Sequence, residues 1–203
     1  MAWLESEYFQ YQRILGIDEA GRGPLAGPCV VAGVILPKGY THPLINDSKK
    51  LSEKQRERCF VDIIKDALWV GVISVLPKTI DQRNIYQATK DANIRLIGLA
   101  DADLCLTDAI PIDHLPIPVY DFIKGDSRSI SIAAASIVAK VCRDTMMKAY
   151  DELYPGYGFK QHKGYPTKVH IDALDRLGIT PIHRLSYEPV ARLTRPTLFD
   201  GNE

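Results

Sequence analysis

Two apolar segments separated by a glycine-rich turn constrain the fold of this chain most. Residues 13–18 (RILGID) are typical of a strand, and residues 29–36 (CVVAGVIL) are rich in β-branched side chains between Pro28 and Pro37. Such segments form buried strands, because β-branched side chains fit a pleated sheet and prolines end it. The short link between them favours an antiparallel, hairpin-like pair. The sequence therefore predicts that the fold begins with two paired strands.

Strand and helix patterns alternate along the rest of the chain. Strands are expected at 68–76, 104–107 and 117–122, and helices at 52–65 (with Ser52 as N-cap), 79–99, 129–153 and 167–177. Strands that first pair in sequence and then alternate with helices indicate an α/β domain with a mixed sheet. No repeat or linker interrupts the 203 residues, so residues 1–203 are expected to form one domain, with a helical, substrate-contacting C-terminal portion at about 155–203.

Composition excludes several classes of protein. The longest apolar run, at 29–36, is too short to span a bilayer, and Glu5 and Glu7 stand where a signal peptide needs basic and then apolar residues. Four cysteines without a CxxC pair suggest a reducing compartment, so a cytoplasmic location is expected. The net charge is zero, yet residues 91–126 are acidic and residues 124–170 are basic. This asymmetry indicates either a cation site beside a polyanion track or ordinary solvated faces.

The glycine-rich turn carries the first residues with chemical potential. Asp18 and Glu19 follow an apolar strand, and buried acids are rare unless they are paired or bound to metal. Gly21 and Gly23 leave the backbone open to a ligand. A tight turn with a polar rim is the alternative. The segment 21–26 also matches a GxGxxA dinucleotide fingerprint, but that motif needs a following helix, whereas a strand is expected here.

The segment 18–36 (DEAGRGPLAGPCVVAGVIL) resembles the N-terminal signature of bacterial ribonuclease HII. Further matching blocks follow in order: DSKKLS at 47–52, KGD at 124–126, AAASIVAKV and RD within 133–144, YGF and HKGYPT within 157–167, and the stretch 183–190. Together the blocks span about residues 14–190. The resemblance implies a ribonuclease-H-like fold and endonucleolytic cleavage of RNA paired with DNA, including single ribonucleotides in duplex DNA. It also implies products with a 5′-phosphate and a 3′-hydroxyl.

The resemblance implies four carboxylates around two divalent ions, namely Asp18, Glu19, Asp108 and Asp126. Oxygen ligands of this kind suit Mg²⁺ or Mn²⁺. The family usually has Gly-Asn after the third of these acids, whereas Ala109-Ile110 follow here, so neighbouring aspartates compete with Asp108: Asp101, Asp103, Asp113 and Asp121. Asp126 has an alternative interpretation as a helix N-cap.

The same resemblance implies a set of substrate-binding residues. Gly21, Arg22 and Gly23 are expected to reach the 2′-hydroxyl of the substrate, and Tyr165 is expected to pack on the sugar beside the cleavage site. A buried core tyrosine is the alternative for Tyr165. Candidate phosphate contacts are Lys49, Lys50, Lys140, Arg143, Lys163 and Arg184, each of which could instead be a solvated or structural charge. His162 and His183 lie in matching blocks and are given no catalytic role.

The remaining expectations concern partners and rival functions. A monomer is expected, and no membrane partner. Leu198 and Phe199 in the C-terminal tail suit a weak sliding-clamp contact, although the upstream Gln of such motifs is missing and a tail packed on its own domain or disordered is favoured. A ribonuclease HIII, with its extra N-terminal domain, is disfavoured because the first strand begins near residue 13. A non-catalytic hybrid-binding module of the same fold is the alternative function.

Overall fold

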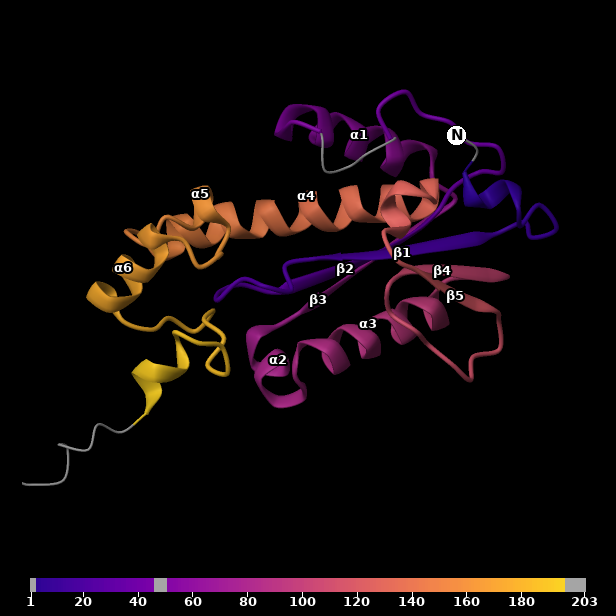
Figure 1. The fold of residues 1–203 in the computed structure, drawn as a ribbon. Coiled ribbons are helices and arrows are strands. Elements are labelled where there is room, and N and C mark those ends of the chain that lie inside the picture. Colours follow the sequence, from indigo (N-terminus) through magenta and orange to yellow (C-terminus); the bar gives the residue numbers. More distant parts are fainter. Residues whose placement is uncertain (1–2, 46–50, 196–203) are drawn as a thin grey trace, which may run out of the picture.

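A computed structural model describes residues 3–45 and 51–195, which form a mixed five-stranded sheet between two helical layers (Figure 1). The strands are β1 Ile14–Ala20, β2 Cys29–Ile35, β3 Trp69–Val75, β4 Leu104–Asp108 and β5 Val119–Phe122. Their order in the sheet is β3-β2-β1-β4-β5. Strand β1 runs antiparallel to β2 and parallel to β4. The antiparallel first pair and the mixed sheet expected from the sequence are therefore confirmed.

The helices cover both faces of the sheet (Figure 1). They are α1 Glu53–Asp66, α2 Pro77–Arg83, α3 Ile85–Leu99, α4 Ile130–Leu153, α5 Phe159–His162 and α6 Lys168–Leu177, with short 3₁₀ turns η1 Leu4–Ser6, η3 Gly125–Ser127 and η4 Ala191–Thr194. Helices α1 and α4 lie on one face, and α2 and α3 on the other. Among the described residues, none of these helices combines the length and the apolar character needed to cross a membrane.

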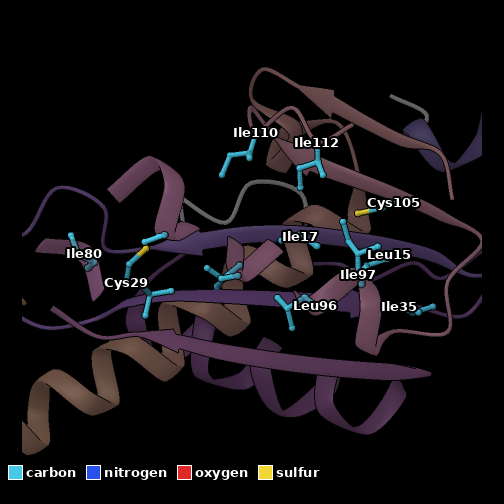
Figure 2. Packing of buried hydrophobic residues seen from close by; sticks show 14 residues of the cluster. Leu15, Ile17, Cys29, Ile35, Ile80, Leu96, Ile97, Cys105, Ile110 and Ile112 are labelled. Atoms are coloured by element: carbon cyan, nitrogen blue, oxygen red, sulfur yellow. The ribbon is translucent and has the colours of Figure 1, made fainter. Parts of the chain in front are cut away.

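Side chains alternate between the two faces of the sheet along β1 and β2, and this alternation determines the face on which Asp18 lies. Leu15 and Ile17 pack with α3 in the cluster of Figure 2, whereas Ala32 packs with α1 and α4 on the opposite face. Helix α4 approaches β1 closely because Gly16 has no side chain: a Cβ there would lie 2.2 Å from the backbone carbonyl carbon of Ser131. Since side chains alternate with a period of two, Asp18 faces α4 as Gly16 does.

The single helix predicted at 79–99 is wrong. The structure divides this segment into α2 and α3 at Asn84, whose φ of 61° lies in the left-handed region. The Asn84 side chain accepts a hydrogen bond from the Gln87 N–H and so caps α3. Asparagine tolerates this backbone conformation and is a favoured N-cap. The apolar stripe continues through the break, which is why periodicity alone does not reveal it.

The C-terminal segment wraps around the turn that joins β1 to β2. Backbone hydrogen bonds join Leu25 to Gly164 and Gly27 to Ile182, and a further one runs from the Arg184 N–H to the Leu25 carbonyl. Helices α5 and α6 lie beside the C-terminal end of α4 (Figure 1). The turn at 21–28 leads into β2 and not into a helix, which removes the dinucleotide-binding interpretation.

Candidate functional site

Asp18 and Asp108 lie on neighbouring parallel strands. Ile17 of β1 pairs with Thr107 of β4, so the next residue on each strand is an aspartate. Adjacent strands are about 4.8 Å apart, which brings the two carboxylates together. Of the competing aspartates, Asp103 lies just before β4 and accepts the backbone N–H groups of Gln12 and Arg13. The other three, Asp101, Asp113 and Asp121, are exposed.

The turn η3 brings Asp126 next to Asp108. The Gly125 N–H donates to Asp108 Oδ1 at 2.9 Å, and Asp126, the next residue, is 4% exposed. The N-cap interpretation of Asp126 is wrong for the long helix α4, because Ser129 is its N-cap and accepts the Ile132 N–H. The segment before α4 therefore presents a buried carboxylate that the capping of that helix does not require.

Burial and neighbouring carboxylates raise the pKa values of Asp18 and Glu19. Burial raises the pKa of Asp18 well above its usual value, and the charges of Glu19 and Asp108 raise it further. Burial also raises the pKa of Glu19; the Arg22 guanidinium, 3.5 Å from Glu19 Oε1, opposes this shift, and Asp108 adds to it. Negative charge gathered in a buried place is unfavourable unless a cation balances it. This all-oxygen donor set fits a hard divalent cation.

The carboxylates are held by protein donors in this structure. Asp108 accepts from Gly125, Asp18 Oδ1 accepts from the Glu19 N–H at 2.7 Å, and Glu19 pairs with Arg22. Within residues 3–45 and 51–195, no group of three or more His, Cys, Asp or Glu side chains already has the spacing of a metal site. An ionised carboxylate has about four acceptor positions, so these hydrogen bonds leave positions at which a divalent ion can bind.

A polar cavity of about 430 Å³ opens beside Glu19. Three cationic side chains line it together with an aromatic ring; its lining residues are Glu19, Ala20, Gly21, Arg56, Ser136, Lys140, Arg143 and Tyr165. Arg56 and Ser136 were not expected from the sequence. The Ser136 side chain hydrogen-bonds Asp18. Both residues lie on helices, where nothing in the sequence distinguishes the turn that faces a cavity.

Tyr165 lies at the rim of this cavity and is 43% exposed, so the core-tyrosine alternative is wrong. A Cβ on Gly23 would lie 3.8 Å from Tyr165 Cε1, and the Arg143 guanidinium lies 6.0 Å from the ring centroid. Gly21 has a φ of 97°, and a Cβ there would lie 2.0 Å from Arg143 Nε. The turn at 21–23 and Tyr165 thus form one surface.

Arg143 and Arg184 do not lie on the surface where the phosphate contacts were expected. Arg143 is 1% exposed and donates to the carbonyls of Pro28 and Lys163, both at 2.9 Å. Arg184 is 0% exposed. It donates to the carbonyls of Gly21, Arg22 and Gly27 at 2.6–3.1 Å. For Arg184 this burial contradicts a phosphate contact, and the side chain instead ties the turn at 21–27 to the C-terminal segment.

The lysines among the expected phosphate contacts are placed differently. Lys140 lines the cavity and pairs with Asp144 at 2.8 Å, and Lys163 donates from Nζ to the Lys160 carbonyl at 2.6 Å. Lys49 and Lys50 lie outside the described residues.

Three histidines form a stack behind Tyr165, which we call the histidine stack: His162, His170 and His183. The rings of His162 and His170 lie 4.5 Å apart at an interplanar angle of 13°. His170 Nε2 and His183 Nε2 are 3.2 Å apart. Burial lowers the pKa of both His170 and His183 to about 4, and each of the two is further lowered by a neighbouring histidine. The stack is therefore neutral at physiological pH.

Acid is expected to destabilise the protein through this stack. A histidine whose folded pKa is about 4 binds its proton in the unfolded chain first, so stability falls as the pH drops from about 6.5 towards 4. The loss is roughly 2 kcal/mol per histidine at pH 5. The melting temperature measured between pH 7 and pH 5 is expected to fall less steeply in His170→Asn than in the wild type. Equal slopes of melting temperature against pH in the two proteins would contradict the low pKa of His170. Protonation of Asp18 and Glu19 also changes stability in this range, but it is common to both proteins and cancels in the comparison.

Comparisons with known proteins agree with this geometry. The family model described as Ribonuclease HII matches residues 15–190. The ribonuclease HII of Bacillus cereus (strain AH820) is 54% identical over 164 residues, which cover 80% of this chain and 63% of the relative. The chain thus spans less than two thirds of the length of the curated relatives it matches.

Two solved structures resemble the fold over most of the chain. The ribonuclease H2 from Pyrococcus horikoshii OT3 has a TM-score of 0.78 at 25% identity, with 89% of this chain and 96% of that chain covered. A chain of the PCNA:RNase HII complex from Archaeoglobus fulgidus has a TM-score of 0.74 at 27% identity, with 92% and 98% covered. The matched family model covers the strands, the carboxylates and the histidine stack, and the chain therefore belongs to the ribonuclease HII family.

Proposed function

We propose that this chain is an endonuclease that hydrolyses the RNA strand of RNA–DNA hybrids and nicks duplex DNA on the 5′ side of a single embedded ribonucleotide. The observation that carries this proposal is the pair Asp18 and Asp108 on adjacent parallel strands, with Glu19 beside them and Asp126 on the following turn. The family membership and the basic cavity next to Glu19 support it.

Asp18, Glu19, Asp108 and Asp126 are the residues that would hold two divalent ions, Mg²⁺ or Mn²⁺. Bound there, such ions would supply an activated water and charge stabilisation for the leaving 3′-oxygen, chemistry that would give 5′-phosphate and 3′-hydroxyl ends. The protein's own contribution is to hold these carboxylates on a rigid sheet and to keep Asp18 buried against α4. Rigid placement of the ligands favours the transition state because no reorganisation is needed during the reaction.

Recognition of RNA is assigned to the surface formed by the turn at 21–23 and Tyr165. Gly23 is exposed beside the Tyr165 ring, and Gly21 is packed against Arg143 where it lines the cavity. The 2′-hydroxyl is the group that distinguishes ribose from deoxyribose. Lys140 and Lys163 stay candidate phosphate contacts, as do Lys49 and Lys50 beyond the described residues. Such contacts position the duplex without reading its sequence.

Location and partners extend this proposal. The four cysteines, all within the described residues, are free thiols, which supports a cytoplasmic protein. A monomer stays a prediction. The clamp contact through the tail concerns residues 196–203, which lie outside the described residues; the complex with PCNA is a property of the Archaeoglobus fulgidus relative.

The test is a labelled DNA duplex with one ribonucleotide, incubated with Mg²⁺, with Mn²⁺ and with EDTA. We expect a metal-dependent nick on the 5′ side of the ribonucleotide, and cleavage of a long hybrid.

In Tyr165→Ala, the kcat/KM for the single ribonucleotide is expected to fall by about 100-fold, and the melting temperature to stay nearly constant, because the ring is at the surface and positions the reacting sugar.

Tyr86→Ala is the matched control, because Tyr86 is a surface tyrosine of α3, on the opposite face of the sheet, with 36% exposure. Its kcat/KM is expected to equal that of the wild type. Cleavage of long hybrids alone would withdraw the role given to Tyr165. Tight binding of the duplex without cleavage in either metal would favour the non-catalytic binding module instead.

A further inference from the structure

The histidine stack has hydrogen bonds that fix the position of every ring proton. Thr180 donates its backbone N–H to His183 Nδ1 at 3.0 Å, so the His183 proton is on Nε2. That N–H points at His170 Nε2, 3.2 Å away, which must accept and therefore carries no proton. The His170 proton is then on Nδ1 and donates to the Tyr165 carbonyl at 3.0 Å.

The chain of hydrogen bonds thus runs in one direction from Thr180 to the Tyr165 backbone. Any additional proton would place two N–H groups face to face between His170 and His183, or between His183 and the Thr180 N–H. Each bond polarises the next in the same sense, which strengthens a buried network. Among ordinary side chains, only a neutral imidazole can accept on one ring nitrogen and donate from the other, so histidine suits the two middle positions.

His162 binds the neighbouring backbone N–H. Its Nδ1 accepts the Gly164 N–H at 3.1 Å, and its Nε2 donates to the Tyr157 carbonyl at 2.8 Å. The Tyr165 N–H in turn donates to the His162 carbonyl at 2.9 Å. The Phe159 ring lies edge-on against His162 and His170, at centroid distances of 5.8 and 5.4 Å. Two stacked imidazoles therefore hold this stretch of backbone, His162 through the Gly164 N–H and His170 through the Tyr165 carbonyl.

These hydrogen bonds fix the backbone of Tyr165, whose side chain lies at the rim of the cavity beside Glu19. The Tyr165 ring is held by few side-chain contacts: it lies beside Gly23 and Arg143 at the cavity rim, and no hydrogen bond of its hydroxyl is seen among the described residues. Since the direction of a side chain follows its backbone, the bonds to the Gly164 N–H and to the Tyr165 carbonyl set the position of the ring. A misplacement of about 1 Å at a positioning group can cost about 100-fold in rate.

We propose that the histidine stack is a positioning device that sets the Tyr165 ring against the Gly21–Gly23 turn and thereby determines how well the enzyme discriminates a single ribonucleotide from a long hybrid. This inference rests on the proposed function and assigns a role to His162, His170 and His183 in it. These histidines touch no reacting atom; they act through Tyr165.

Two substitutions of His170 separate positioning from stability. In His170→Asn the amide nitrogen takes the place of Nδ1 and keeps the bond to the Tyr165 carbonyl, while the partner of His183 is lost. In His170→Gln the longer side chain places its amide near the position of Nε2, so the contact with His183 is kept and the bond to Tyr165 is lost. Both variants lose the ring stack, and both are expected to melt at a lower temperature.

The readout is the ratio of kcat/KM on a duplex with one ribonucleotide to kcat/KM on a long hybrid. We expect this ratio to fall about tenfold in His170→Gln and to stay within about twofold of the wild type in His170→Asn. Tyr165→Ala combined with His170→Gln is expected to show no larger change than Tyr165→Ala alone, because both act on one ring. His114→Asn, at an exposed loop position, is the matched control and should leave the ratio unchanged.

An equal ratio in His170→Gln and His170→Asn would overturn the positioning role and leave the stack a structural element. A wild type that does not cleave the single-ribonucleotide duplex would instead overturn the proposed function. The protonation pattern is read without activity: imidazole ¹⁵N spectra at pH 7 are expected to show His170 protonated on Nδ1, and His162 and His183 on Nε2. A different tautomer of His170 would contradict the hydrogen-bond chain from Thr180 to the Tyr165 carbonyl and would overturn the proposal.

Discussion

Asp18→Asn is expected to slow hydrolysis severely and, in the same protein, to raise the melting temperature in the absence of divalent ions. Asp18 is buried, and burial together with Glu19 and Asp108 raises its pKa well above the usual value. Keeping its charge at neutral pH therefore costs folding free energy, because the unfolded chain ionises this group freely. Asparagine has the same shape, and its oxygen still accepts the Glu19 N–H.

The gain is measured as the rise in melting temperature over the wild type in EDTA at neutral pH. Turnover is expected to fall by on the order of 10³-fold, since one charged group at the reacting centre is lost. Addition of Mg²⁺ should raise the melting temperature of the wild type by ligand linkage and that of Asp18→Asn much less. The charged Asp18 is thus expected to lower the free energy of unfolding while being required for hydrolysis.

Asp121→Asn is the matched control, because Asp121 lies on β5 beside Thr107 but is exposed. Neither its turnover nor its melting temperature is expected to change. Near-normal turnover in Asp18→Asn would remove Asp18 from the site. A lower melting temperature in EDTA would mean that the carboxylate mainly serves as an acceptor for the Glu19 N–H and the Ser136 side chain.

The parts of this fold that the sequence predicts well are those decided by local pattern. The first two strands follow from β-branched residues between glycine and proline, and the helix after Ser52 follows from its capping box with Gln55. The carboxylate pair is different, because the neighbours of Asp108 on the sheet depend on register. The pairing of Ile17 with Thr107 places Asp108 beside Asp18, whereas Asp103 lies just before β4 and accepts the backbone N–H groups of Gln12 and Arg13.

The parts that the sequence does not predict depend on contacts between distant segments. Arg184 is buried because it donates hydrogen bonds to carbonyls of the 21–27 turn. Buried carbonyls need donors, and strand pairing does not supply them in this turn. The residues next to Arg184 in the sequence give no sign of those carbonyls. A basic residue in a basic segment therefore suggests a phosphate contact. The histidine stack is hidden in the same way, since its members come from α5, α6 and a loop.

Arg184→Lys distinguishes these two interpretations of Arg184 by a large effect. The guanidinium donates from three nitrogens to the carbonyls of Gly21, Arg22 and Gly27, and a single ammonium cannot reach all three. Buried acceptors then lose their donors, at a cost of about 3 kcal/mol or more. We expect the melting temperature to fall by on the order of 10 °C.

The matched control is Arg176→Lys, because Arg176 makes one exposed hydrogen bond to the Gly156 carbonyl, and its melting temperature is expected to change by no more than about 2 °C. A phosphate contact at position 184 predicts the opposite pattern: Arg184→Lys would keep its melting temperature, bind duplex more weakly, and lose about one unit of the slope of log affinity against log salt. With Arg184 fully buried, we expect the salt slope to stay unchanged in the fraction that is still folded, because the lost donor was holding the turn beside Tyr165 and never faced the duplex.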